Sequence, residues 1–249
     1  MHSVMIMSRF HVGPRQGHLD WLSKIFGYLR KHPEAKIRFR TGIPDCEAFY
    51  SMPEHDWMHS VYGEAEAPFI DATPPPKGKT AWVMAFCDSA LAACKVSGKA
   101  STGVLVFANQ TPMDWHLKLQ KPTKTAVYGA KFSVAQTGTE KLMDILATLR
   151  AMGVPLDGEA WSLGDNKSVV TSSTIPHSVL VEQHNFLSCH HVRAAVAHKV
   201  MKFCHVRTHQ NIADILTKFL GFQQFQPSTG PTLFKSGDTA WRKAKKQVS

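Results

Sequence analysis

Long apolar runs are missing from this sequence of 249 residues. No stretch approaches the roughly 18 consecutive apolar residues that a membrane-spanning helix needs, so no such helix is predicted. The N-terminus also lacks the layout of a secretory signal peptide. Its first acidic residue is Asp20, and Arg9 and Arg15 precede it. A mitochondrial presequence therefore stays open as an alternative to a nuclear or cytoplasmic location.

Cysteine is scarce and irregularly spaced. The chain has five cysteines, at Cys46, Cys87, Cys94, Cys189 and Cys204. A disulfide framework normally uses an even number of cysteines at regular spacings. The pattern therefore favours a reduced intracellular protein over a secreted, disulfide-stabilised one.

Acidic residues are outnumbered by basic ones. The chain has 19 Asp and Glu against 29 Lys and Arg, which gives a net charge of +10 and a pI near 9.5. Such a balance favours a polyanionic partner, with nucleic acid ahead of a membrane surface. A hydrophobic content of 43% is normal for a globular protein, and the length allows one large domain or one domain with extensions.

The N-terminal part of the sequence predicts a helix and a strand before an irregular stretch. Apolar residues recur at helical spacing over 16–31, and His32-Pro33 ends that helix. Residues 36–40 alternate and predict a strand with one basic face. Residues 43–79 lose periodicity and hold several prolines, which indicates a linker or a long loop.

Regular structure is dense after residue 80. The patterns predict, in order, strands over 81–86, 102–107 and 113–118, a helix over 126–152, a strand over 160–163, a helix over 180–198, a strand over 201–206 and a helix over 211–220. The short connections between the first three strands predict hairpins. The helix over 126–152 has an inner stripe that includes Val127, Val134, Leu142 and Met152.

Three acids lie at the ends of these elements or within them. Asp88 follows an apolar strand, Asp165 follows another, and Asp214 lies in the last helix. Where a fourth acid would complete a set, on the inner stripe of the long helix, the sequence has Lys131. Three acids arranged in this way suggest a nuclease that uses two metal ions. Each acid alone is better explained as a turn residue or a helix cap, and it is the ordered set that points to a present or former site.

Several motifs in this order resemble one family. They are Gly164-Asp165-Asn166-Lys167-Ser168, Ala213-Asp214-Ile215-Leu216-Thr217-Lys218, Ser8-Arg9-Phe10, Thr102-Gly103, Gln120-Lys121-Pro122-Thr123 and Val192-Arg193. Together they resemble the ribonuclease H region of copia-type LTR-retrotransposon polyproteins over about residues 8–221. Pro112-Met113-Asp114-Trp115 is most similar to the diatom-type branch. The resemblance implies an α/β ribonuclease H-like fold, with a mixed five-stranded sheet flanked by helices and an N-terminal helix-strand extension.

The resemblance also implies a chemistry for the acids. Two Mg²⁺ ions about 4 Å apart activate water and stabilise the leaving oxygen during phosphodiester cleavage. Asp88 would bridge the ions, and Asp165 and Asp214 would each complete one site. The family pattern places a catalytic glutamate where this chain has Lys131. Glu140 does not replace it, because nine residues carry it along the helix and onto the opposite face.

A lysine at position 131 puts a positive charge where a divalent ion should bind. The sequence therefore predicts an internal ion pair in place of at least one metal, and a degenerate, inactive domain that binds nucleic acid or serves in a larger protein or ribonucleoprotein assembly. The alternative is an active, Mg²⁺-dependent ribonuclease acting on RNA/DNA hybrids. Candidate contacts to such a partner, independent of its base sequence, are Lys99, Ser101, Thr102, Asn166, Lys167, Arg242, Lys243, Lys245 and Lys246.

The chain is expected to divide into four parts. Residues 1–42 form a helix and strand that resemble the segment joining polymerase to nuclease, and 43–79 form a proline-rich linker or loop. Residues 80–221 form the ribonuclease H-like domain. Residues 222–249 form a basic tail, whose contacts with a polyanion would be sensitive to salt.

Overall fold

The structure is a computed structural model, and it describes residues 2–33, 35–37, 39–44, 53–63, 73–121, 126–180, 185–230 and 232–234. Its elements, in chain order, are α1 (His2–Met7), η1 (Ser8–Phe10), α2 (Gln16–Lys31), β1 (Lys36–Ile37), β2 (Val83–Ala90), β3 (Ser101–Ala108), β4 (Thr111–Leu119), α3 (Val127–Ala151), β5 (Ala160–Gly164), α4 (Lys167–Thr174), α5 (Phe186–Ala197), β6 (Met201–His205), η3 (Thr208–Gln210), α6 (Asp214–Thr217), α7 (Phe222–Thr229) and β7 (Leu233–Phe234).

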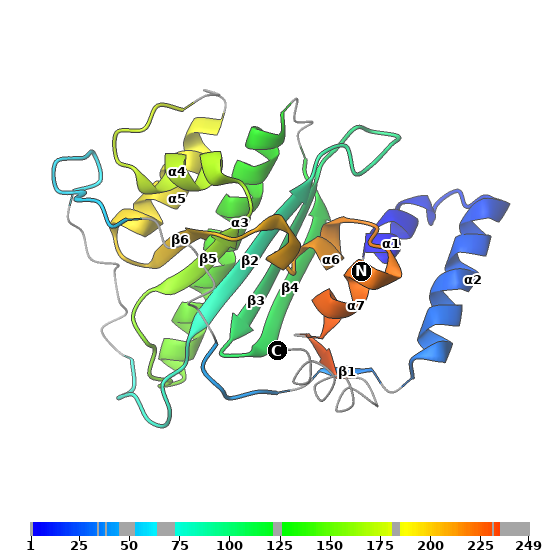
Figure 1. The fold of residues 1–249 in the computed structure, drawn as a ribbon, viewed down its shortest axis with the longest axis horizontal. Helices are drawn as coiled ribbons and strands as arrows, with labels where there is room; N and C mark the ends of the chain where they lie inside the picture. Colours follow the sequence, from blue (N-terminus) through cyan, green and yellow to red (C-terminus); the bar gives the residue numbers. More distant parts are fainter. Residues whose placement is uncertain are drawn as a thin grey trace.

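A mixed five-stranded sheet occupies the centre of the structure (Figure 1). Its strand order is β4-β3-β2-β5-β6. Strands β2, β3 and β4 pair antiparallel, and β5 and β6 run parallel to β2. The turn between β3 and β4 is tight because Asn109 adopts a left-handed backbone with φ of 54°, which asparagine tolerates better than most residues. The hairpins predicted from the short connections are therefore present.

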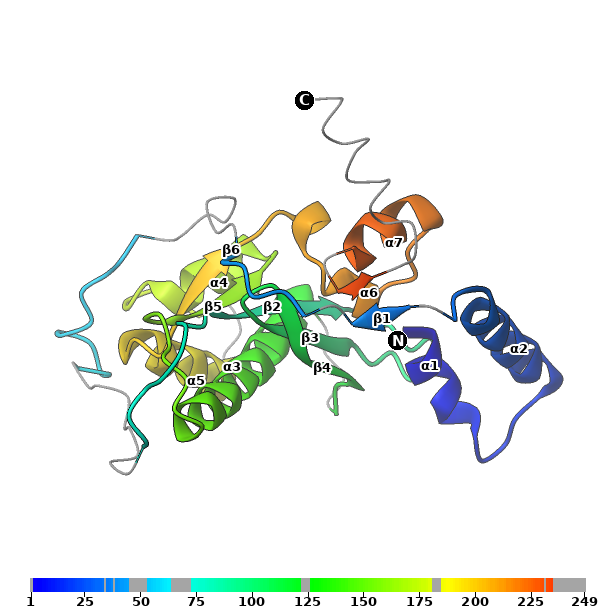
Figure 2. The ribbon, with the colours of Figure 1, turned by 90° about the horizontal axis from the view of Figure 1, so that it is seen from below.

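Helices cover the two faces of the sheet unequally. The long helix α3, with α4 and α5, covers one face, whereas the α6 segment lies on the other (Figure 2). Each face has its own apolar core, and Phe132 and Leu146 of α3 are fully buried in the larger one. This strand order with helices on both faces is the ribonuclease H-like α/β fold, as the sequence predicted.

Helix α3 carries part of its predicted inner stripe into the core. Val134 and Leu142 are buried. Val127 and Met152, expected on the same stripe, are instead exposed at the two ends of the helix. Val127 is the first residue of α3 and Met152 follows its last, so the helical spacing holds there without burial. Lys131 lies on the buried part of the stripe.

The N-terminal elements only partly follow the prediction. Helix α2 spans the expected residues, but the predicted strand over 36–40 is reduced to β1, which pairs with β7. The described parts of 43–79 contain no helix or extended strand. One of them, residues 53–63, is docked against the domain: Trp57 is buried, and the Tyr62 hydroxyl lies 2.5 Å from Nδ1 of His190. Residues 45–52 and 64–72 lie outside the described residues.

The C-terminal predictions need three corrections. Helix α5 begins at Phe186, later than the expected 180, and residues 181–184 lie outside the described part. The helix predicted over 211–220 is the single turn α6, because Asn211 and the following turn hold the chain against β2. The start of the expected tail, 222–234, forms α7 and β7, whereas 235–249 lie outside the described residues. Within the described ranges, no helix has the length and apolar character of a membrane span.

Candidate functional site

Asp88 is at the centre of a cluster of charged side chains. It lies within β2, two residues before the strand ends, rather than after the strand as predicted. Its side chain is fully buried. One carboxylate oxygen, Oδ1, is 2.5 Å from Nζ of Lys131. The other, Oδ2, accepts a hydrogen bond from the Thr217 hydroxyl and lies 3.6 Å from Nζ of Lys218.

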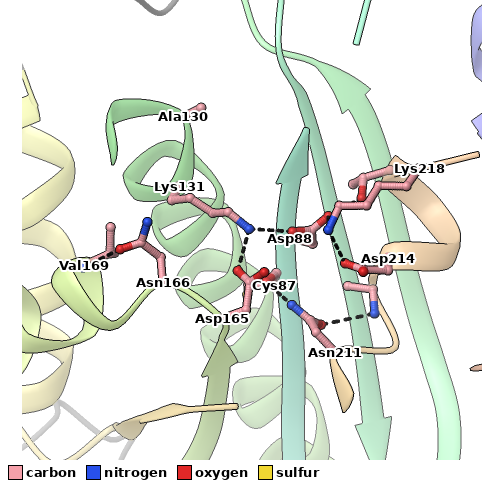
Figure 3. Close-up of polar contacts among 12 residues, drawn as sticks. Cys87, Asp88, Ala130, Lys131, Asp165, Asn166, Val169, Asn211, Asp214 and Lys218 are labelled. Atoms are coloured by element: carbon pink, nitrogen blue, oxygen red, sulfur yellow. Dashed lines mark hydrogen bonds and ion pairs between the residues drawn. The ribbon is translucent and has the colours of Figure 1, made fainter. Parts of the chain in front are cut away.

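Lys131 binds two carboxylates at once. Its ammonium group donates to Asp88 and to Oδ1 of Asp165, which β5 delivers to the same place from the neighbouring strand (Figure 3). Burial of Lys131 acts to lower its pKa, but the two carboxylates outweigh burial and raise the pKa above its ordinary value. The structure thus contains the internal ion pair that the sequence predicted.

The third acid, Asp214, is paired with Lys218. Asp214 begins α6, and its Oδ1 is 2.8 Å from Nζ of Lys218, four residues later. Asn211 fixes this segment to the sheet: its side-chain amide donates to the Cys87 carbonyl, and its Oδ1 accepts the N–H of Ala213 (Figure 3). Tertiary contacts therefore place Asp214 and Lys218 beside Asp88.

Electrostatics in the cluster follow from burial and from the two lysines. Burial acts to raise the pKa of Asp88, but Lys131, Lys218 and the Thr217 hydroxyl together lower it below its ordinary value. Burial and the nearby charge of Asp88 raise the pKa of Asp214 to about 6, against the opposing hydrogen bond from Lys218. With all three acids ionised, three carboxylates face two ammonium groups, and one net negative charge remains.

We define the acid cluster as Asp88, Asp165 and Asp214. One oxygen from each lies within 4.8 Å of the others, and within the described residues this is the group of side chains best placed to hold a metal. Carboxylate oxygens are the ligands that Mg²⁺ prefers, but Mg²⁺ keeps several waters when it binds. The sequence alone predicted that these acids converge, and the structure brings all of them together.

The side chains present do not fit a pair of divalent ions. The Lys131 ammonium lies between Asp88 and Asp165, and the Lys218 ammonium lies between Asp88 and Asp214. Each carboxylate oxygen of Asp88 therefore already faces an ammonium group where a divalent ion would need it.

The predicted nucleic-acid contacts are scattered rather than gathered. Lys167 is exposed at the start of α4, and Lys99 is half-buried in the connection between β2 and β3. Asn166 caps α4 by accepting the N–H of Val169, the structural role also considered for it. Ser101 and Thr102 are buried within β3 and present no side chain to a partner, because both faces of this central strand are covered. Arg242, Lys243, Lys245 and Lys246 lie outside the described residues.

Sequence reasoning missed two contributors to the site. Lys218 and Thr217 both contact Asp88, although they stand 130 and 129 residues away from it in the chain. A signal for Lys218 was present, because it follows Asp214 by four residues, the spacing at which side chains meet on a helix. No local pattern indicated that Thr217 would reach Asp88.

The strand order defines the class of protein: the chain contains a ribonuclease H-like domain. Its sequence is similar to retrovirus-related Pol polyproteins from transposons RE1 and RE2 of Arabidopsis thaliana. The RE1 protein is 29% identical over 162 residues, which cover 63% of this chain and 11% of the relative. The RE2 protein is 29% identical over 160 residues, covering 62% of this chain and 11% of the relative. The chain thus spans about a tenth of the length of these curated relatives, and no protein-family model matches it.

Solved ribonucleases H show a similar fold at low sequence identity. RNase H1 from Halobacterium salinarum is 16% identical, with a TM-score of 0.40, over 54% of this chain and 93% of that one. The N-terminal RNase H domain of a Mycobacterium tuberculosis protein was solved as a fusion with maltose-binding protein. It is 16% identical, with a TM-score of 0.41, over 60% of this chain and 97% of that one. LC11-RNase H1 in complex with an RNA/DNA hybrid is 16% identical, with a TM-score of 0.41, over 54% of this chain and 93% of that one.

Proposed function

We propose that this chain is a degenerate, retrotransposon-derived ribonuclease H-like domain that binds nucleic acid without cutting it. The observation that carries the proposal is the position of Lys131, whose ammonium group is hydrogen-bonded to both Asp88 and Asp165. A cation fixed there repels a divalent ion directly, and it already binds carboxylate oxygens that the ion would need as ligands. Metal-dependent activation of water is therefore lost.

A cleavage assay tests the loss of activity. The purified chain, incubated with Mg²⁺ or Mn²⁺ and a labelled RNA/DNA hybrid, is expected to leave the RNA strand intact. The matched control is Asp88→Asn, which removes the central carboxylate and should behave like the unmodified chain. Metal-dependent cleavage by the unmodified chain that disappears in Asp88→Asn would overturn the proposal.

Binding of nucleic acid is proposed from charge. The chain carries a net charge of +10, and the basic residues Arg242, Lys243, Lys245 and Lys246 near its end are proposed to contact phosphates. The logarithm of the binding constant for such a partner falls linearly with the logarithm of the salt concentration, and the slope is set by the number of phosphates that the protein neutralises. Replacing the four with alanine is expected to reduce that slope by about 3 to 4 for a duplex. An unchanged slope would show that residues other than these four contact the phosphates.

The second candidate is an active, Mg²⁺-dependent hybrid-specific ribonuclease. The observation in its favour is the convergence of Asp88, Asp165 and Asp214 within 4.8 Å. Activity would require the Lys131 ammonium group to leave the two carboxylates that hold it, and its side chain is only 10% exposed. The cleavage assay separates the two candidates directly.

We also propose that the chain is recruited into a larger protein or ribonucleoprotein assembly. Helix α2 exposes several apolar side chains, Leu19, Leu22, Phe26 and Leu29, and it lies at the edge of the molecule, away from the α3 face of the sheet (Figure 2). Purification of the chain from its native cells, followed by analysis of copurifying protein and RNA, tests this. Recovery of a monomer with neither would contradict recruitment into an assembly.

A further inference from the structure

Lys218 occupies a position that mirrors that of Lys131. It directly follows α6, and its side chain turns back so that Nζ lies 2.8 Å from Oδ1 of Asp214 and 3.6 Å from Oδ2 of Asp88. Lys131 contacts the opposite oxygen of Asp88, Oδ1. Figure 3 shows the two ammonium groups on either side of the Asp88 carboxylate. Each carboxylate oxygen of Asp88 is thus directed toward a cation supplied by the chain itself.

These contacts form two separate cation positions that share Asp88. The first position lies between Asp88 and Asp165 and holds the Lys131 ammonium. The second lies between Asp88 and Asp214 and holds the Lys218 ammonium. A divalent ion at either position would have to displace an ammonium group that the carboxylates already attract.

We propose that Lys218 is the second internal counter-ion, so that the chain fills both cation positions with its own lysines. The proposal extends the proposed function, which rests on Lys131 alone. It predicts that a glutamate at position 131 would reopen only the first position. Binding of a divalent ion at the second position would stay weak until the charge of Lys218 is also removed.

The two ammonium groups differ in how easily a divalent ion could displace them. The Lys131 side chain is 10% exposed, whereas that of Lys218 is 33% exposed. A partly exposed ammonium group leaves a carboxylate at lower cost than a buried one, because water replaces the lost contact. Binding of a divalent ion at the second position is therefore expected to be weakened by Lys218, and to be at least about tenfold tighter once its charge is removed.

Titration with Mn²⁺, followed by electron paramagnetic resonance, counts bound ions without requiring activity. The full chain is compared with Lys131→Glu, Lys218→Met and the double variant. The expected counts are no ion for the unmodified chain, one for each single variant and two for the double variant. Lys218→Arg, which keeps the charge, is expected to bind no ion.

A matched control separates the charge of Lys218 from a general effect of removing a lysine. Lys141 is also 33% exposed and pairs at 2.9 Å with Asp114, on a different part of the sheet. Lys141→Met should leave the Mn²⁺ count unchanged. Circular dichroism and thermal unfolding establish that each variant folds, and Lys218→Gln replaces Lys218→Met if the latter does not.

The outcomes distinguish the two proposals. Two tightly bound Mn²⁺ ions in Lys131→Glu, with no gain in the double variant, would overturn the role of Lys218 and leave that of Lys131 intact. Two ions in the unmodified chain would overturn both. Tighter binding in Lys218→Met but not in Lys218→Arg or Lys141→Met would support the assignment.

Discussion

Gly103 of β3 lies directly opposite Asp88 of β2 in the antiparallel ladder. A Cβ atom at Gly103 would lie 2.5 Å from Cγ2 of Thr217 and 3.1 Å from Cβ of Leu216. The missing side chain therefore lets α6 approach the sheet closely enough for Thr217 to donate its hydroxyl to Asp88. The same approach brings Asp214 and Lys218 into the cluster.

Gly103→Ala is expected to push α6 away from β3. Overpacking of this kind typically costs about 1 to 3 kcal/mol in the free energy of unfolding, which urea denaturation measures. Gly27→Ala is the matched control, because Gly27 lies in α2 and a Cβ atom added there would meet no other atom within 4 Å. Alanine at that position should stabilise the helix by up to about 1 kcal/mol. Equal stabilities for the two variants would contradict the close-approach role of Gly103.

Lys131→Met is expected to destabilise the fold by about 3 kcal/mol, because it leaves Asp88 and Asp165 without their shared cation in a buried site. Asp88 keeps its contacts with Thr217 and Lys218, which limits the loss. Lys141→Met, which breaks a partly exposed ion pair, should cost less than about 1 kcal/mol. Guanidinium chloride denaturation of both variants tests the contrast, and similar losses would show that burial of the Lys131 pair contributes little.

The cost of Lys131→Met should depend on pH in a defined way. The pKa of Asp88 is lowered in the folded chain from its ordinary value of 3.8, so its contribution is present above that value and is lost as the pH falls through the folded pKa. The pKa of Lys131 is raised from its ordinary value of 10.5, so its contribution is present below that value and is lost as the pH rises through the folded pKa.

The stability difference between the unmodified chain and Lys131→Met is therefore expected to be constant near neutral pH and to shrink at both extremes. Urea denaturation at a series of pH values measures the difference. A cost that does not change toward acid pH would show that Asp88 does not depend on the Lys131 charge.

The buried thiol of Cys94 is expected to ionise near neutral pH. Burial acts to raise the pKa of its thiol, but hydrogen bonds from Ser97 and Arg9 lower it to about 7. The ultraviolet absorbance of the thiolate, taken as the difference between the unmodified chain and Cys94→Ser, should be half-developed near that pH. Absorbance is used because Cys94 is only 2% exposed and a reagent would reach it poorly. Cys189, whose pKa burial raises, is the internal control, and Cys189→Ser should leave that midpoint unchanged. Arg9→Gln should move the midpoint upward, and a midpoint near 9 in the unmodified chain would contradict the effect of these hydrogen bonds.

The sequence predicted the strands of the central sheet and the long helix closely. The helix is long and strongly periodic and the strands are apolar runs, so the local pattern indicates the type of each element. The extent was less exact, because β2 runs over Val83–Ala90 rather than 81–86. The shorter elements were less accurate. The helix expected over 211–220 is reduced to Asp214–Thr217 because Asn211 ties the preceding turn to Cys87 of β2, a contact between residues 124 positions apart that no local pattern contains.

The N- and C-terminal segments show the same limit. The strand over 36–40 and the start of the expected tail share a short ladder, β1 with β7. Pairing between such distant segments is a tertiary property: residues 36–40 alternate as a strand does, but their partner was expected to lie in the tail. Residues 53–63 gave no periodic signal, yet Trp57 is buried.

For the site, the sequence by itself determined which residues matter and how their charges oppose one another: three acids in or beside predicted elements, and Lys131 on the buried stripe of the long helix. The period of a helix is a local property, so the position of Lys131 can be derived from sequence. The end of a strand is less certain, because β2 continues past Asp88 to Ala90. Only the tertiary structure decided that Lys218 and Thr217 also reach Asp88. Their position beside Asp88 depends on the space left by Gly103 and on the hydrogen bond from the Asn211 side chain to the Cys87 carbonyl. Both are packing relationships between segments more than 100 residues apart.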